Sequence, residues 1–164
     1  DAAPTETDRQ LYRALKKWGY PLPFEETEID RVWRSRDGTM VMDTTKLEFR
    51  ADRADLQLWF GKLAGKDGGI TLSKLEAHSN ERQYSVALLP WDTGDFQTAK
   101  TLVVWSHWNG EVTVKLPLPE NPEIYAVNWL GKRLYRVKPI SASKERVTFA
   151  TIRDDDIFCY EVLR

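Results

Sequence analysis

The sequence predicts an all-β fold: a two-layer antiparallel β-sandwich, jelly-roll-like, with one short N-terminal helix. After residue 24 the chain consists of about a dozen short runs rich in β-branched and aromatic residues, separated by Gly, Pro, Asp and Asn, which is typical of such sandwiches. No helical period recurs after Gly19, whereas a parallel sheet needs crossover helices between its strands. We therefore expect a linker plus amphipathic helix over residues 1–24 and one β-sandwich domain over residues 25–164.

The helix is expected from Thr7 to Trp18. Thr7 and Gln10 have the spacing of a capping box, in which each side chain accepts a hydrogen bond from the backbone N–H of the other residue. Apolar side chains then recur at helical spacing along one face: Leu11, Leu15 and Trp18. Gly19 follows where a left-handed C-terminal cap favours glycine, and two prolines then prevent the helix from continuing.

The strands are expected from short apolar runs between turn signals such as Arg36-Asp37-Gly38. Their predicted bounds are Arg31–Arg34, Met40–Asp43, Leu47–Arg50, Leu56–Leu63, Ile70–Leu75, Tyr84–Leu89, Thr101–Trp108, Val112–Leu118, Ile124–Trp129, Leu134–Val137, Val147–Ile152 and Ile157–Leu163.

Asn109-Gly110 is the clearest turn signal, because a two-residue type I′ hairpin needs positive φ at both central positions. The register that follows places two sets of side chains on opposite faces. One set is apolar and expected in the core: Val103, Trp105 and His107 with Val112, Val114 and Leu116. The other set is mixed and expected outside: Val104, Ser106 and Trp108 with Glu111, Thr113 and Lys115. Trp105 is thus predicted to be buried and Trp108 to lie near the surface.

The composition limits the class of protein. The chain has 164 residues, 24 Lys and Arg against 25 Asp and Glu, and one Cys. A net charge of −1 argues against nucleic-acid binding, and no apolar run approaches the ~20 residues that span a bilayer. Cys159 cannot form an internal disulfide and has no His/Cys cluster for zinc. We therefore expect neither nucleic acid nor a membrane among the partners.

The seven tryptophans have two interpretations. Large aromatic side chains fill cores and interfaces, and most of the seven are expected to do so. An exposed indole instead packs on the C–H face of a pyranose ring while flanking polar groups bind its hydroxyls. The candidate carbohydrate-binding residues on the polar hairpin face are Trp108, Ser106, Glu111, Thr113 and Lys115.

Catalytic motifs are scarce, and no catalytic residue is predicted. The chain has no phosphate-binding loop, nucleophile elbow or zinc motif. His107 is expected to be a hydrogen-bonded core residue and Cys159 to be inert packing. Acidic clusters lie between predicted strands, where Asp bonds its own turn backbone. As alternatives, Asp92, Asp95, Asp154 and Asp156 are candidate calcium ligands. Asp92, Asp95 or Asp154–Asp156 could instead supply the paired carboxylates of a small hydrolytic enzyme. No other cofactor is expected.

A family resemblance is carried by turn-and-strand patterns. The segment Trp33–Leu63, WRSRDGTMVMDTTKLEFRADRADLQLWFGKL, resembles part of the C-terminal region of some bacterial secreted glycoside hydrolases. There a Ser-Asp-x-Gly turn precedes a Lys-Gly-x-Phe strand, an Asp-containing link and a strand ending in Gly. The corresponding residues are Ser35, Asp37, Gly38, Lys46, Leu47 (at the glycine position), Phe49, Asp52 and Gly61. Tyr84–Lys100 and the closing segments VNWLGKRLYRV and DDDIFCYEVL are similar to later strands of such domains.

The resemblance implies a non-catalytic accessory β-sandwich domain of a carbohydrate-active protein, structural or weakly carbohydrate-binding. In that family the catalytic carboxylates belong to a separate (β/α)-barrel domain, which does not fit in 164 residues, so the chain alone is not expected to be an enzyme. The implied partners are a polysaccharide or oligosaccharide and the catalytic domain of the same polypeptide. The implied location is secreted or periplasmic. A free-standing carbohydrate-binding module and a protein–protein interaction domain stay open as alternatives.

Overall fold

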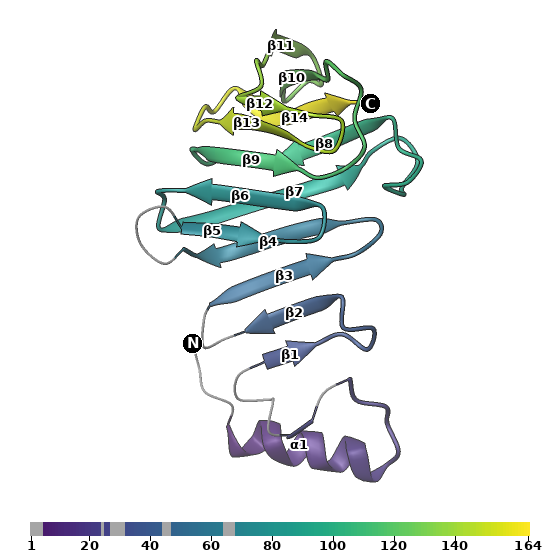
Figure 1. Cartoon of the computed structure of the whole chain (residues 1–164). Coiled ribbons are helices and arrows are strands. Elements are labelled where there is room, and N and C mark those ends of the chain that lie inside the picture. The colour runs from purple at the N-terminus through teal and green to yellow at the C-terminus, as the bar shows by residue number, and fades with distance from the viewer. Residues whose placement is uncertain (1–4, 24, 27–31, 44–46, 64–67) are drawn as a thin grey trace.

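The computed structural model describes residues 5–23, 25–26, 32–43, 47–63 and 68–164. These residues form one helix and fourteen strands in two antiparallel sheets, which is the all-β sandwich with one helix that the sequence predicts (Figure 1). The elements are α1 (Glu6–Lys17), β1 (Val32–Arg34), β2 (Met40–Asp43), β3 (Glu48–Asp52), β4 (Gln57–Lys62), β5 (Gly68–Thr71), β6 (Leu75–Ser79), β7 (Gln83–Pro90), β8 (Thr101–Trp105), β9 (Gly110–Val114), β10 (Glu123–Asn128), β11 (Arg133–Arg136), β12 (Ser141–Ala142), β13 (Val147–Thr151) and β14 (Ile157–Leu163).

The two sheets differ in size. The long sheet has nine strands in the order β1-β2-β3-β4-β7-β8-β14-β10-β11, and the short sheet has five in the order β12-β13-β9-β6-β5. Within the described ranges, no helix is long and apolar enough to cross a membrane.

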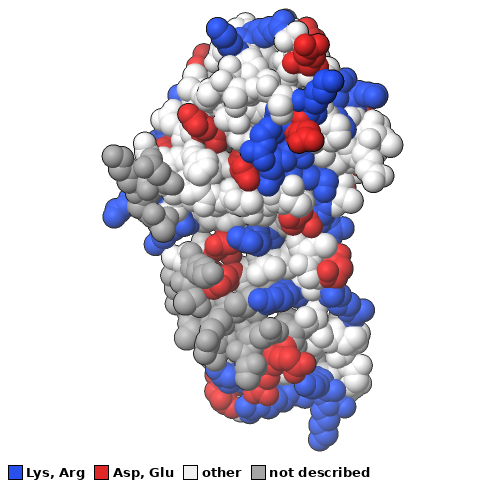
Figure 2. All heavy atoms as spheres, in the orientation of Figure 1, with Lys and Arg blue, Asp and Glu red and all other residues white. Residues whose placement is uncertain are grey.

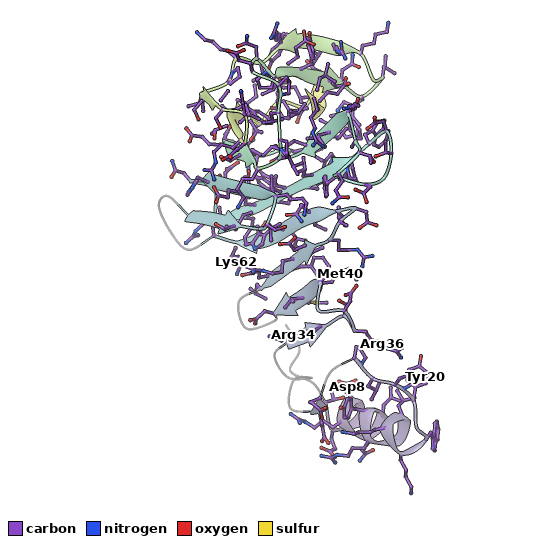
Figure 3. All side chains as sticks on the ribbon, turned by 45° about the vertical axis from the view of Figure 1, so that its right-hand side comes forward. Asp8, Tyr20, Arg34, Arg36, Met40 and Lys62 are labelled. Carbon is purple, nitrogen blue, oxygen red and sulfur yellow. The ribbon has the colours of Figure 1, made fainter. Side chains whose placement is uncertain are left out.

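The hydrophobic core lies between the two sheets and begins at β4. Its large side chains come from both sheets: Trp59, Tyr84 and Tyr160 from the long one, Leu75 and Phe149 from the short one. Among the described residues, the core cluster has no member from β1, β2 or β3. These three strands, which we call the overhang, continue the long sheet beyond the sandwich toward α1 (Figure 1). Arg34 and Met40 lie in this narrow stretch (Figure 3).

The inner face of the long sheet changes character where the overhang begins. Cross-strand partners share a face, and along one row from β1 to β7 they are Arg34, Val41, Arg50, Trp59 and Val86. Arg50 is ion-paired with Glu48 of its own strand (Nη2–Oε1 2.7 Å), whereas Trp59 and Val86 are buried. The overhang therefore presents charged groups to water on this face, and the second sheet covers the apolar part.

The outer faces of the two sheets also differ. On the short sheet, Lys115 and Arg146 lie 3.2 and 4.0 Å from the carboxylate oxygens of Glu76. The face seen in Figure 2 carries basic and acidic side chains interspersed along its length, in keeping with the net charge of −1. The long sheet instead has an apolar outer face, on which Met42 and Phe60 are 43% and 49% exposed. This apolar face carries the candidate site described below.

The helix forms with a different N-terminal cap from the predicted one. Thr5 is the N-cap, and the capping box joins it to Asp8: Asp8 N–H donates to Thr5 Oγ (3.2 Å) and Thr5 N–H donates to the Asp8 carboxylate (2.7 Å). The predicted box of Thr7 and Gln10 is wrong, because the charged Asp8 interacts more favourably with the positive end of the helix dipole than a neutral Gln does. Gly19 has the predicted left-handed conformation, with φ of 78°.

The buried side chain of α1 is Tyr12. Leu11 and Trp18 of the predicted apolar stripe are 58% and 77% exposed. The segment after the helix contacts the turn between β1 and β2, where Arg36 Nη2 donates to the Pro21 carbonyl at 3.0 Å.

One predicted strand is wrong. Ile70–Leu75 is divided between β5 and β6 by a tight turn. Asp52 and Gln57 of the long sheet accept hydrogen bonds from the backbone N–H groups of Ser73 and Lys74, at 2.8 and 3.0 Å. These N–H groups are therefore satisfied by side chains rather than by a β-ladder. The strand β6 and the two-residue β12 are not among the predicted strands.

Asn109-Gly110 does not form the predicted hairpin. β8 pairs with β7 and β14, whereas β9 pairs with β6 and β13, so the chain crosses between the sheets at these residues. Neither residue has a positive φ. Asn109 donates its backbone N–H to Glu81 (3.2 Å) and accepts the Arg153 N–H at its side-chain oxygen (2.9 Å). A Cβ on Gly110 would lie 2.7 Å from the His78 carbonyl oxygen, so this glycine permits a close approach to β6.

The two faces of β8 are the reverse of the prediction. Val104 and Ser106 are buried on the inner side, and Trp108 is half-buried against the main core. Val103 and Trp105 lie on the outer side, in a small cluster with Val127 and Cys159. The placement of Trp105 in the main core is therefore wrong, and Trp108, although near the surface, packs against the main core rather than on a polar outer face. The outer face of the long sheet is itself apolar, so alternation of apolar residues does not identify the inner face.

Candidate functional site

Four ring side chains gather on the outer face of the long sheet, where β8 and β10 end and β14 begins. We call them the aromatic patch: Trp105, His107, Trp129 and Phe158. Their ring centroids are 4.7 Å apart for Trp105 and His107, 5.6 Å for His107 and Trp129, and 4.7 Å for Trp129 and Phe158. The rings are inclined to one another by 51° to 60°, a tilted packing that is favourable for aromatic side chains.

A β-bulge turns Phe158 into this patch. Val127 of β10 pairs with Cys159 and Asn128 pairs with Ile157, so Phe158 has no partner between them. Ile157 and Cys159 are buried, while Phe158 is 37% exposed. Phe158 is the extra residue of this bulge, and the bulge directs its side chain to the outer face, as bulges commonly do.

Trp129 is the most exposed member of the patch and is held in place by its polar edge. Its indole N–H donates to the Asp155 carbonyl at 2.8 Å, and 60% of the residue is exposed. It directly follows Asn128, whose side-chain oxygen accepts the N–H groups of Leu130 and Lys132 at 3.0 and 2.9 Å. Trp129 is therefore an exposed aromatic side chain presented by a well-bonded turn.

His107 lies in the patch rather than in the core. One ring nitrogen, Nε2, is 3.0 Å from the Phe158 carbonyl oxygen. The prediction of a hydrogen-bonded histidine is confirmed, but its location in the main core is wrong because this side of β8 faces outward.

A depression of about 700 Å³ lies beside the patch. Its polar lining comes from the β13–β14 turn, with Arg153, Asp154 and Asp155, and from Ser85 of β7. Aromatic rings and charged groups thus line the same hollow, which is the usual composition of a ligand-binding surface.

Trp108 also lines this depression but does not offer a free ring. Its indole N–H donates to Ser85 Oγ at 2.9 Å. The Arg153 guanidinium lies over the ring, 4.6 Å from its centroid, and is held by Glu81 (Nε–Oε2 2.6 Å). Trp108 is therefore covered on one face by a cation, whereas Trp129 is open to solvent.

The structure does not bring the other predicted sugar contacts together with Trp108. Ser106 is buried and donates to the Ser85 carbonyl at 3.0 Å. Glu111, Thr113 and Lys115 belong to β9 or follow it, in the other sheet. Thr113 is hydrogen-bonded to Thr148 of β13 (2.7 Å), and Lys115 is ion-paired with Glu76 of β6. Their grouping depended on the hairpin that does not form.

The acidic clusters serve the turns in which they lie. The backbone N–H groups of Lys100 and Thr101 donate to Asp92 at 3.0–3.1 Å and lower the pKa of its carboxyl group. Asp95 accepts from Gln97 N–H at 2.7 Å. In the other cluster, between β13 and β14, Asp154 accepts from Asp156 N–H at 2.9 Å.

The two clusters lie far apart. Thr101 pairs with Leu163 at the C-terminal end of β14, so Asp92 and Asp95 lie at that end, whereas Asp154 and Asp156 precede the first residue of β14. The two groups therefore cannot act as one pair. Within the part of the chain that the structure describes, no group of three His, Cys, Asp or Glu side chains is placed to hold a metal ion.

Cys159 is buried against Val103 and Val127. Burial, with a smaller contribution from Glu161, raises the pKa of its thiol to about 11. The side chain is a packing residue, as the sequence predicts.

Comparison of the chain with protein-family models, curated proteins and solved structures gives no match.

The sequence prediction missed Trp129 and Phe158 as site residues. A usable signal was present for Trp129, because Asn128-Trp129-Leu130-Gly131 has turn-forming residues around a Trp that would otherwise continue the strand. The exposure of Phe158 had no such signal, since it depends on a bulge created by pairing with a distant strand.

Proposed function

We propose that the chain is a non-catalytic accessory β-sandwich domain of a carbohydrate-active protein, and that the aromatic patch is its carbohydrate-binding surface. The observation that carries this proposal is Trp129, an exposed indole fixed by its bond to the Asp155 carbonyl. Such a ring packs on the C–H face of a pyranose. Arg153, Asp154 and Asp155 lie beside it with groups that bind hydroxyls.

The backbone at two positions of the family pattern supports the accessory-domain part of the proposal. The pattern has glycine where this chain has Leu47, and Leu47 is the described non-glycine residue with a positive φ, 51°. The pattern also ends a strand with glycine, here Gly61, where a Cβ would lie 2.6 Å from the Leu47 carbonyl oxygen. Two residues that the resemblance aligns to glycines thus pack on each other through their backbones.

The proposal includes the remaining implications of the resemblance. As the resemblance implies, a catalytic domain of the same polypeptide supplies the chemistry, and the acidic clusters of this chain, at opposite ends of β14, do not form one catalytic pair. The parent protein is proposed to be bacterial and secreted or periplasmic, where it meets a polysaccharide.

Glycan-array screening followed by calorimetric titration tests the binding role. The wild-type chain should bind at least one glycan, and Trp129→Ala should weaken that binding about tenfold or more, because one aromatic stacking contact is lost. Trp91→Ala is the matched control: Trp91 is 70% exposed but lies after β7, away from the patch, and its loss should leave binding unchanged. Equal affinity of wild type and Trp129→Ala would remove Trp129 from the proposed site.

A further inference from the structure

We infer that the ligand of this surface is an extended glycan chain of several sugar units lying across the strands, rather than a single terminal sugar. This inference rests on the proposed function and specifies its ligand. It is carried by a second aromatic group, the stacked pair Phe49 and Phe60, which lies on the same outer face of the long sheet as the aromatic patch.

The register of the long sheet defines a row of cross-strand partners that starts at the Phe pair. Phe49 of β3 pairs with Phe60 of β4, which pairs with Ser85 of β7. The next strand pairs Ala87 with Trp105, and beyond this last pair Ser85 and His107 line the same depression. His107 in turn contacts the Phe158 carbonyl and the Trp129 ring. The row of Phe49, Phe60 and Ser85 therefore ends at the depression that His107 and Trp129 also line.

The Phe pair is stacked and partly exposed. The two ring centroids are 5.4 Å apart with an interplanar angle of 21°, and Phe60 is 49% exposed. Neither ring belongs to the core between the sheets. The pair therefore offers a flat apolar surface that the sandwich does not use for its own packing.

The hollows beside the two aromatic groups meet. A depression of about 550 Å³ is lined by Leu58, Phe60 and Lys62 on the Phe side. It shares Ser85 and Trp105 with the depression of about 700 Å³ beside Trp129. Ser85, Trp105 and Trp108 thus line the junction of the two depressions, which together form one groove from Phe60 to Trp129.

The length of this groove sets the size of the ligand. From β4 to β10 the sheet advances by four strand spacings, through β7, β8 and β14, which amounts to about 19 Å at ~4.8 Å each. A pyranose unit is about as long as one strand spacing, so a single sugar contacts one aromatic group and about four units contact both.

Polar side chains flank both ends of the groove. Lys62 and Gln83 are cross-strand partners beside Phe60, and Arg153, Asp154 and Asp155 lie beside Trp129. Apolar rings with hydrogen-bonding groups at their edges suit a ligand with alternating C–H and hydroxyl surfaces. A purely apolar protein helix would offer no hydrogen-bonding groups to these polar side chains.

Titration with linear gluco-, xylo- and manno-oligosaccharides of one to six units tests the inference. For the series that binds, affinity should rise with length up to about four units and then level off. Phe60→Ala should lower the affinity for the four-unit ligand about tenfold and leave that for the shortest bound ligand unchanged. Trp129→Ala should weaken binding at every length. Tyr135→Ala is the matched control, since Tyr135 is 47% exposed but lies on β11, outside the groove.

The outcomes separate the two proposals. Binding that is independent of length and unaffected by Phe60→Ala overturns the extended-chain inference and leaves the carbohydrate-binding surface intact. Failure of the folded wild-type chain to bind any of the three series or any arrayed glycan overturns the proposed function, and this inference with it. Circular dichroism and a thermal melt establish that each variant is folded.

Discussion

Arg153 Nε lies 2.6 Å from Oε2 of Glu81, and this ion pair joins the turn between β13 and β14 to the turn between β6 and β7. Glu81 also accepts the Asn109 N–H, and the Arg153 N–H donates to the Asn109 side chain. Asn109, where the chain crosses between the sheets, is therefore hydrogen-bonded to both of these turns. The same guanidinium covers the ring of Trp108, so this crossing also shapes the wall of the candidate site.

The Glu81–Arg153 pair should contribute measurably to stability. A double-mutant cycle with Glu81→Gln and Arg153→Gln is expected to give a coupling free energy of about 0.5–1 kcal/mol, because the Glu81 side chain is only 19% exposed. Urea unfolding measures it. The more exposed pair Lys16–Glu25, with 60% and 74% exposure, serves as the control and should give less. A coupling no larger than that of the control pair would contradict the assigned role.

Gly61→Ala should destabilise the protein. An added Cβ would lie 2.6 Å from the Leu47 carbonyl oxygen, a backbone atom that cannot move without shifting β3. The free energy of unfolding should fall by about 1–3 kcal/mol, as for other forced overpacking. Gly94→Ala introduces a Cβ with no atom within 4 Å, at a φ of 76°. It should lower the free energy of unfolding by only about 1 kcal/mol, which is the penalty for a side chain in the left-handed conformation. Denaturant melts compare the two, and a neutral Gly61→Ala would refute the close approach.

Cys159 should be unreactive in the folded protein. With its pKa raised to about 11 by burial, about one thiol in a thousand is deprotonated at pH 8. A disulfide reagent such as 5,5′-dithiobis(2-nitrobenzoate) should therefore react slowly with the native chain and at once in denaturant. Rapid stoichiometric labelling of the native protein at pH 8 would show that the thiol is accessible and ionised.

Asp37 should make the turn between β1 and β2 sensitive to strong acid. Hydrogen bonds from Thr39 and Ser35 lower the pKa of its carboxyl group to about 2. A lowered pKa means that the stabilisation is present in full above the unfolded value of ~3.9 and is lost as the pH falls through about 2. Carbon-detected NMR titration should place the Asp37 midpoint near 2. Asp37→Asn should remove this part of the pH dependence, and an unshifted midpoint would contradict the bonding seen in the turn.

Local patterns predicted the fold class and several elements well. The strands β2 and β14 have the predicted bounds, and the helix differs from its prediction by one residue at each end. These elements depend on side-chain alternation, caps and turn residues that are read from neighbouring positions. The pairing of β8 and β9 could not be read in this way. Asn109-Gly110 has hairpin chemistry, but contacts with Glu81 and Arg153, both distant in sequence, determine its actual conformation.

The site was harder to predict for the same reason. Trp108 was singled out on a register that does not exist, while the exposure of Phe158 depends on how β14 pairs with β10. Burial of one aromatic residue and exposure of another are properties of the assembled sheet. What composition did indicate, an unusual number of tryptophans with at least one at the surface, agrees with the exposure of Trp129.

The overhang gives the molecule a gradient of local stability. β1, β2 and β3 contribute nothing to the buried core cluster among the described residues, although Asp52 at the end of β3 is bonded to Ser73 in the turn between β5 and β6 of the short sheet. We expect them to open at a lower free energy than the sandwich, so their amide protons should exchange first. Phe49 belongs to the overhang, whereas Phe60 belongs to the sandwich. A ligand that spans both rings therefore slows exchange in the overhang, which makes amide protection there a direct report of occupancy at the Phe end of the groove.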